Sequence, residues 1–199
     1  MKSPSEEEAL KLLEKYNVSK GVIKHSIEVK ERALIIGKQI KGAGHDVNLE
    51  LLKVGALLHD LGRGVYDWDN GFDPKDDYHE METYNVLKKE GYEEFGEMLQ
   101  KHALGGLTKE ETKILGYPES RDLVPDSLHI KILCIADKIR PKQGIITLKD
   151  KLEDYRTAKR MWVRYFSKKE GLFEDTCERV TKLWKELVSL GMRDPPISA

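Results

Sequence analysis

The chain has 199 residues and a formal net charge of −1, from 34 basic and 35 acidic side chains. Apolar residues make up 39% and charged residues 35% of the chain, which is polar for a globular domain, but the apolar residues are clustered and periodic, which excludes a disordered tail. Apolar stretches such as 54–58 fall far short of the roughly 20 residues of a membrane-spanning helix, so no membrane segment is expected.

The first residues and the cysteine content bear on where the protein resides. The opening sequence MKSPSEEEAL lacks the apolar core of a signal peptide. Two cysteines are too few for a disulfide framework. These features predict a cytoplasmic protein whose two thiols are reduced and buried.

Helical periodicity, broken by glycine and proline, runs along the chain, and no convincing alternating strand pattern appears. In chain order, we expect helices at about 5–16, 19–40, 48–60, 74–90, 93–102, 109–115, 127–139, 147–166 and 173–190. Ser5 and Asn48 are expected helix caps, and a loop rich in glycine and aspartate covers 61–77. The pattern predicts one all-α domain over residues 1–199, with a core at about 19–145 and an appended C-terminal helical layer at about 147–190.

Two acidic residues and one histidine occupy helix faces that are otherwise apolar. His59 and Asp60 end the segment LELLKVGALLHD, and Asp137 lies within SLHIKILCIADKI. Each follows leucines or alanines at spacings of three, four or seven, so each projects from a face used for the core. A buried carboxylate without a partner costs several kcal/mol or changes its pKa, so a cation is expected to meet Asp60.

Three further histidines show a related placement. His25 lies beside the apolar stripe of its helix, His102 follows apolar residues at helical spacing, and His79 opens a helix after the acidic loop. A lone histidine on an apolar face is more often a hydrogen-bonded core residue. However, a divalent metal ion satisfies buried carboxylates and several imidazoles together, with ligands drawn from separate helices. The shared placement therefore favours a metal site.

The order of these residues, and the strings around them, resemble the HD superfamily of metal-dependent phosphohydrolases. The strings are HSIEVKERA at the first histidine, VGALLHDLGR at the central dyad and IKILCIADKIRP at the last aspartate. The resemblance covers about residues 19–145 and implies an HD-domain helical bundle core. It also implies a minimal set of four metal ligands, namely His25, His59, Asp60 and Asp137.

The resemblance leaves the number of metal ions open. Dinuclear members add histidines between the dyad and the last aspartate, and His79 and His102 lie there in this chain. These two histidines are expected either to complete a second metal site bridged by Asp60, or to hold phosphate or protonate a leaving group. Mixed histidine and carboxylate ligands suit Mn, Fe, Ni, Co, Zn or Mg, so the identity of the metal is also open.

Arg63 is the expected partner of a substrate phosphate, because relatives often carry lysine or arginine at this position. Arginine binds two phosphate oxygens at once. The alternative is a surface arginine that closes the helix. Gly62 and Gly64 flank Arg63 and are expected to let the backbone approach an anionic ligand. The candidate catalytic residues are therefore Asp60, Arg63, His79 and His102.

Other histidines and cations receive structural interpretations. A second HD dipeptide, His45-Asp46, lies in a glycine-rich loop and is attributed to loop and capping chemistry. His129, where relatives often carry glutamate, is expected to face solvent. Lys138, Arg140 and Lys142 follow Asp137 closely, and are either solvated charges or part of the mouth of the site.

The implied activity is hydrolysis of a phosphomonoester, phosphodiester or pyrophosphate bond in a phosphorylated small molecule, in particular a nucleotide. The run 156–169 interleaves six cations with three aromatic residues and can hold a polyphosphate or a nucleic-acid strand, although such helices more often solvate their charges. Nucleic acid is therefore the less favoured partner. The alternatives are a catalytically silent HD-type domain that senses metal or nucleotide, and a helical interaction module without metal. The oligomeric state stays open, a dimer included.

Overall fold

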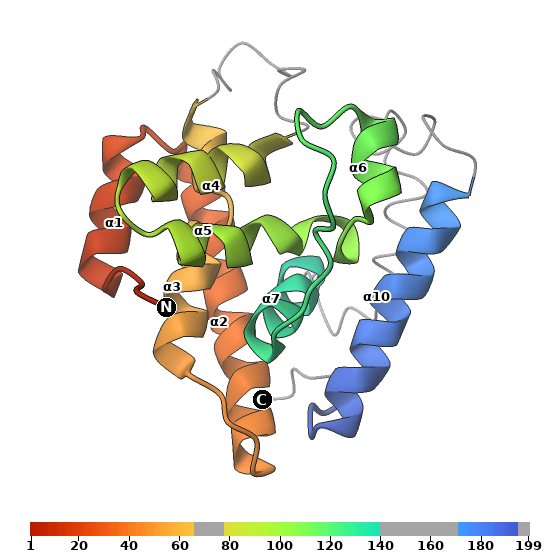
Figure 1. Ribbon diagram of the computed structural model, residues 1–199. Coiled ribbons are helices and arrows are strands. Elements are labelled where there is room, and N and C mark those ends of the chain that lie inside the picture. The colour runs from red at the N-terminus through yellow and green to blue at the C-terminus, as the bar shows by residue number, and fades with distance from the viewer. Residues whose placement is uncertain (66–77, 140–170, 195–199) are drawn as a thin grey trace.

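The structure of the chain is a computed structural model that describes residues 1–65, 78–139 and 171–194 (Figure 1). Within these ranges the fold is all-α, as expected, with one isolated β-bridge between Leu107 and Leu123. The helical elements in chain order are α1 (Glu6–Lys15), α2 (Lys20–Gly42), α3 (Leu49–Leu58), η1 (Leu61–Val65), α4 (His79–Lys89), α5 (Glu93–Leu99), η4 (Gln100–Gly105), α6 (Lys109–Leu115), α7 (Leu128–Lys138) and α10 (Leu172–Ser189).

Side-chain caps set most of the helix starts. Ser5 and Glu8 form a reciprocal capping box at α1, and Ser19, Asn48 and Ser127 each accept a hydrogen bond from an amide in the first turn of α2, α3 and α7. The predicted starts of these helices are therefore confirmed to within one residue. The predicted helix at 147–166 and the basic aromatic run at 156–169 lie outside the described residues.

Two predicted helix ends are wrong, and both errors fall beside the candidate site. The helix expected to reach Asp60 ends at Leu58, because the carbonyl of His59 accepts a hydrogen bond from the Thr83 hydroxyl of α4 (3.1 Å). The helix expected to reach residue 102 changes at Gln100 into the tighter η4, and Leu104, with φ 50°, leaves helical geometry altogether. His59, Asp60 and His102 thus lie just beyond the end of a regular α-helix, whereas His25 and Asp137 lie within α2 and α7.

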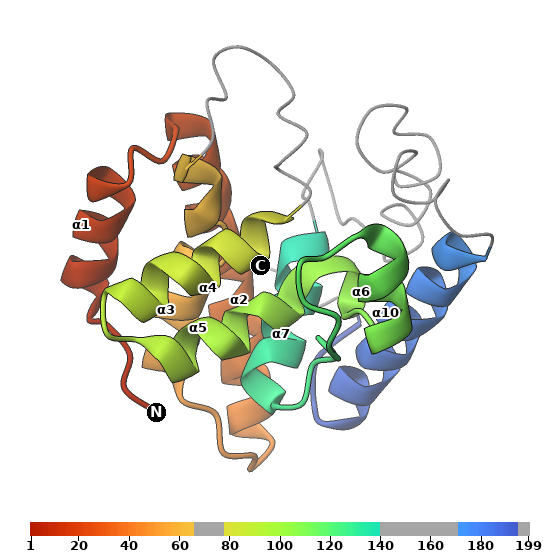
Figure 2. The same ribbon diagram turned by 45° about the horizontal axis from the view of Figure 1, so that its top comes forward.

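The long helix α2 packs against both α3 and α7 (Figure 1). Helix α4 packs against α5 and against η1, which together with His59 and Asp60 forms the dyad segment. A fully buried stripe of α2, consisting of Val29, Ala33, Ile36 and Ile40, lies in the main core. Helices α1 and α10 lie on opposite sides of the bundle in both views (Figure 2). None of the described helices is long and apolar enough to cross a lipid bilayer.

The C-terminal helix α10 forms an added layer over α7 and η4, as predicted. Its side chains Val180, Trp184 and Leu187 join the main core, whereas Leu172 joins a smaller apolar cluster around Leu104. This packing places α10 directly behind the backbone that carries His102.

Candidate metal centre

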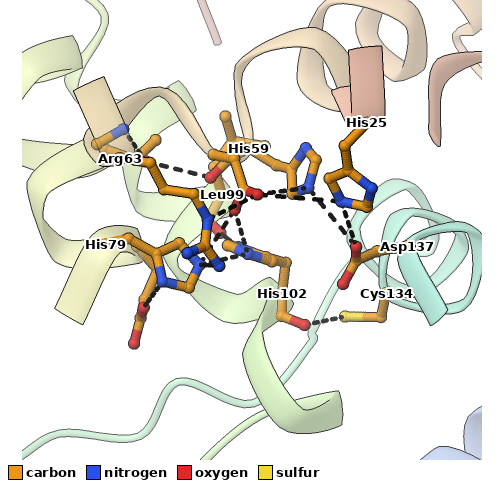
Figure 3. A network of polar contacts seen from close by, with 12 residues as sticks. His25, His59, Arg63, His79, Leu99, His102, Cys134 and Asp137 are labelled. Atoms are coloured by element: carbon orange, nitrogen blue, oxygen red, sulfur yellow. Dashed lines mark hydrogen bonds and ion pairs between the residues drawn. The ribbon is translucent and has the colours of Figure 1, made fainter. Parts of the chain in front are cut away.

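The structure brings together all six side chains that the sequence suggested as metal ligands (Figure 3). His25 lies in α2, His59 and Asp60 follow the end of α3, and His79 is the first residue of α4. The remaining two come from η4 and α7, and are His102 and Asp137. Five separate segments therefore converge on one place.

The first half of the centre lies around Asp137 and one oxygen of Asp60. The Nε2 atom of His25 lies 3.0 Å from Asp137 Oδ1 and 3.9 Å from Asp60 Oδ2. The Nε2 atom of His59 lies 3.7 Å from each of the same two oxygens. Each of the two histidine nitrogens thus lies within 4 Å of one oxygen of Asp60 and one oxygen of Asp137.

The second half uses the other oxygen of Asp60. Asp60 Oδ1 lies 3.1 Å from His79 Nε2 and 3.7 Å from His102 Nε2, and these two nitrogens are 3.3 Å apart. Two groups, His25-His59-Asp60 and Asp60-His79-His102, therefore have ligand atoms close enough to hold a metal ion, and Asp60 belongs to both. One carboxylate shared in this way can bridge two ions.

Backbone carbonyls fix the orientation of two of the imidazole rings. His59 Nδ1 lies 2.8 Å from the Ala56 carbonyl, and His102 Nδ1 lies 2.8 Å from the Leu99 carbonyl. A carbonyl only accepts, so each Nδ1 carries the hydrogen, and each Nε2 of the neutral ring presents its lone pair to the carboxylates. The same arrangement orients histidines in known metal sites.

A divalent cation fits this set of donors. The Nε2 atom of His59 is buried and has no hydrogen-bond partner within the described part of the chain. Lone pairs and carboxylate oxygens that face one another repel unless a cation lies between them. Two ligands at about 2.1 Å from one ion lie about 3.0–3.5 Å apart, and the distances between donor atoms here are close to that range.

Charges around the centre keep both carboxylates ionised, as metal ligation requires. Burial alone would raise the pKa of Asp60, but the Arg63 guanidinium and the His59 ring hold it well below its usual range. Burial would likewise raise the pKa of Asp137, but the Lys138 ammonium and the His25 ring hold it well below its usual range.

The three buried imidazoles differ in the direction of their pKa shifts. Burial and the nearby Arg63 lower the pKa of His79 to about 4, and burial lowers the pKa of His102. Burial also opposes protonation of His59, but Asp60 and Asp137 outweigh it and raise the pKa of His59. Neutral His79 and His102 are the form in which imidazole binds a metal.

Arg63 lies inside the centre and is not a surface residue that closes a helix. Its Nε forms an ion pair with Asp60 Oδ2 (2.8 Å), and its Nη2 lies 3.3 Å from His79 Nε2 (Figure 3). The surface alternative is therefore wrong. The expectation for the flanking glycines is also wrong, because a Cβ at Gly62 would collide with the backbone of α4, and one at Gly64 with the Tyr16 carbonyl. These glycines allow close packing of η1 and leave no room for a ligand at their Cα atoms.

The residues interpreted as structural divide into two groups. His45 and Asp46 are exposed in the loop before α3, as expected. His129 is only partly exposed, and its Nε2 accepts a hydrogen bond from the Asn48 amide (2.9 Å), so the expectation that it faces solvent is wrong. Lys138 is buried instead of solvated or at a mouth, and Arg140 and Lys142 lie outside the described residues.

Sequence reasoning missed Glu80, which is buried next to the centre. Its Oε1 accepts a hydrogen bond from the Tyr117 hydroxyl, and its Oε2 lies 3.4 Å from His79 Nδ1. Burial raises the pKa of Glu80 to about 7. No pattern in the sequence singles out Glu80, because adjacent helical residues usually point to different surroundings.

The chain belongs to the HD domain family, whose sequence model matches residues 22–142. This match includes all six convergent side chains. The family and the geometry together define a helical domain with a histidine- and aspartate-lined centre suited to divalent metal.

Curated relatives carry different names. The chain is 31% identical over 185 residues to a tRNA (cytidine(56)-2'-O)-methyltransferase of Thermoplasma volcanium, which covers 92% of this chain and 47% of that protein. It is 34% identical over 134 residues to an uncharacterised protein of Methanocaldococcus jannaschii, covering 67% of this chain and 73% of that protein. The chain thus spans about half the length of the relative named as a methyltransferase.

A solved structure resembles the chain over most of its length. The HD domain of the phosphodiesterase PgpH from L. monocytogenes aligns with a TM-score of 0.48 and 18% sequence identity, covering 89% of this chain and 98% of that chain. The same domain solved in complex with cyclic-di-AMP aligns with a TM-score of 0.48 and 16% identity, covering 88% of this chain and 97% of that chain.

Proposed function

We propose that this chain is a metal-dependent phosphohydrolase that cleaves a phosphomonoester, phosphodiester or pyrophosphate bond of a nucleotide-like substrate. The observation that carries the proposal is the pair of triads that share the ionised Asp60 carboxylate. Membership of the HD domain family supports it.

The first ion would be held by His25, His59, Asp60 and Asp137, and a second by Asp60, His79 and His102. A divalent ion bound there lowers the pKa of coordinated water and neutralises charge on a phosphoryl group. Manganese, iron, nickel, cobalt, zinc and magnesium are the candidates for this donor set.

Arg63 supplies the positive charge of the chain itself. Its guanidinium lies against Asp60 and His79, and its side chain is mostly buried, so solvent screens its charge little. A guanidinium has five N–H donors in a fixed plane, which suits the equatorial oxygens of a phosphoryl group. Arg63 would therefore stabilise the negative charge that develops on those oxygens during hydrolysis.

His79 and His102 suit metal binding better than proton donation. The pKa of His79, at about 4, leaves its ring neutral near pH 7, and a neutral ring with its lone pair directed at the centre has no proton to give at that atom. These two histidines would therefore act by holding a second ion or by accepting hydrogen bonds from bound water.

The proposal is tested by hydrolysis of bis(p-nitrophenyl) phosphate and p-nitrophenyl phosphate with added manganese. We expect Asp60→Ala to lower the manganese-dependent rate by at least about a hundredfold, because it removes the carboxylate common to both triads. The matched control is Asp46→Ala in the exposed dipeptide, which we expect to leave the rate unchanged. Activity that Asp60→Ala leaves intact would exclude hydrolysis at this centre. Where activity is lost as expected, a screen of nucleotides, dinucleoside polyphosphates and sugar phosphates would define the substrate class.

A second candidate is a catalytically silent HD-type domain that binds metal or nucleotide. The observation that favours it is that nearly all of this chain aligns with only about half of a longer protein named as a tRNA methyltransferase. Elemental analysis of protein purified without chelator separates the candidates, since bound metal without hydrolysis across the phosphoester screen favours the silent domain. Substoichiometric metal, with no thermal shift on adding divalent ions, would favour a helical interaction module.

A further inference from the structure

Lys138 is the last residue of α7 and is only 2% exposed. Lysine is almost never fully buried unless it is paired, because removal of an ammonium group from water costs several kcal/mol. The Lys138 ammonium group is therefore expected to have polar partners inside the protein.

The ammonium group lies on the far side of the Asp137 carboxylate from the imidazoles. Lys138 Nζ is 3.4 Å from Asp137 Oδ2, whereas Asp137 Oδ1 lies 3.0 Å from His25 Nε2 and 3.7 Å from His59 Nε2. The two oxygens are thus divided between two partners. With Oδ2 paired to the ammonium group, Asp137 presents Oδ1 alone to the centre.

The same ammonium group also holds the backbone of the second triad. Lys138 Nζ donates a hydrogen bond to the His102 carbonyl (3.2 Å), and the Cys134 thiol, one helical turn earlier in α7, lies 3.4 Å from the same oxygen. The chain leaves helical geometry directly after His102, at Ala103 and Leu104, so regular helical hydrogen bonds do not continue past this point. Side chains of α7 therefore replace them.

From these contacts we infer that Lys138 is a positioning residue of the metal centre, which fixes Asp137 beside the first triad and the backbone of His102 in the second. One buried charge thereby sets the spacing of the two halves. The inference rests on the proposed metal centre and adds a residue that does not itself touch the metal or the substrate.

The experiment is a titration of the metal-free protein with Mn²⁺, followed by isothermal calorimetry, in the parent and in Lys138→Met. Methionine keeps the length and the apolar stem of lysine without its charge. We expect the dissociation constant of Mn²⁺ to rise about tenfold, as for loss of other groups that orient metal ligands. The matched control is Lys131→Met on the same helix, whose ammonium group pairs with Glu186 of α10 (2.7 Å), and it should bind Mn²⁺ like the parent.

Two further measurements separate positioning from a purely structural role. In an Asp137→Asn background, Lys138→Met should weaken Mn²⁺ binding by a smaller factor than in the parent, because the pair is already broken. Thermal unfolding with chelator measures the stability of the metal-free fold. If Lys138→Met lowers only that unfolding temperature and leaves the Mn²⁺ dissociation constant unchanged, or if its effect is equal in both backgrounds, the inference is overturned.

A second variant keeps the test decisive if Lys138→Met does not fold. Lys138→Gln retains a donor for the His102 carbonyl and loses the charge, so weaker Mn²⁺ binding in this variant supports the inference and parental binding overturns it. Failure of the proposed centre itself gives a different result, because the parent would then bind no Mn²⁺ at all.

Discussion

The dipeptide His-Asp occurs twice in this chain, once at each end of helix α3. His45-Asp46 precedes the helix and is exposed, whereas His59-Asp60 follows it and is 0% and 5% exposed. The two pairs are identical in covalent structure and lie a single ten-residue helix apart. Their difference shows that a short motif acquires its chemistry from what the fold places around it.

The surroundings of the second pair account for this difference. The Thr83 hydroxyl accepts a hydrogen bond from the Gly62 amide (2.9 Å) and donates one to the His59 carbonyl, which attaches the dyad segment to α4. Four further candidate ligands and Arg63 then surround Asp60. In this buried setting, opposite charges interact more strongly than at a solvated loop.

The largest expected difference between the two pairs is in the effect of removing the histidine. His59→Ala should weaken Mn²⁺ binding by at least about a hundredfold, since it deletes a ligand of the first triad, and His45→Ala should leave it unchanged. Calorimetric titration of the metal-free proteins measures both. Equal affinities in the two variants would contradict the assignment of His59 as a ligand.

A smaller difference, in the free energy of unfolding, is expected when the glycine near each pair is replaced by alanine. Gly62→Ala should lower the free energy of unfolding by about 2 kcal/mol, because the new methyl group would collide with the backbone of α4. Gly42 has open space at its Cα in the last turn of α2, so Gly42→Ala should raise stability by about 0.5 kcal/mol. Urea unfolding gives both values, and a neutral Gly62→Ala would show that the dyad segment packs more loosely.

The burial around the second pair also predicts a dependence on pH. The pKa of His79 is about 4 in the folded chain against 6.5 for a free histidine, so the folded state binds fewer protons between these values. The free energy of unfolding of the metal-free protein should therefore fall as pH drops from about 6.5 to about 4, by up to about 1.4 kcal/mol per pH unit. Urea unfolding of the parent should show a steeper decline than that of His79→Gln, and parallel curves would rule out this contribution.

The smallest effect concerns the exposed pair. Burial lowers the pKa of His129, and the Asp46 carboxylate opposes that shift. Asp46→Asn should therefore lower the pKa of His129 further, by a few tenths of a unit. NMR titration of the His129 ring measures it, and an unchanged pKa would show that Asp46 has no electrostatic effect on His129.

Much of this arrangement could be predicted from local sequence signals. The expected caps at Ser5 and Asn48 located the starts of two helices, and the placement of acids on apolar stripes identified Asp60 and Asp137 as candidate ligands. The helix starts were confirmed because capping and helical periodicity are properties of a few neighbouring residues. The convergence of all six candidate ligands followed from the resemblance to the HD superfamily and not from spacing alone.

Several of the errors involve contacts between distant segments. Gly62 and Gly64 pack closely against the backbone of α4 and of Tyr16. His129 accepts a hydrogen bond from the Asn48 amide. Burial of Lys138 depends on the carbonyl of His102 in another element. Such contacts depend on tertiary packing, which residue type and local spacing do not reveal.

The carbonyl groups of Ala56 and Leu99, which orient His59 and His102, belong to the final turns of α3 and α5. The last carbonyls of a helix lack amide partners within it, so each helix end offers a ready acceptor three residues before the ring. The length of each helix therefore determines where the ring nitrogen lies relative to the carboxylates. Lengthening either helix by one residue would turn the ring by about 100° about the axis and carry the nitrogen away from the carboxylates. Insertions within these two helices should thus be tolerated far less than insertions of equal size in the loop before α3.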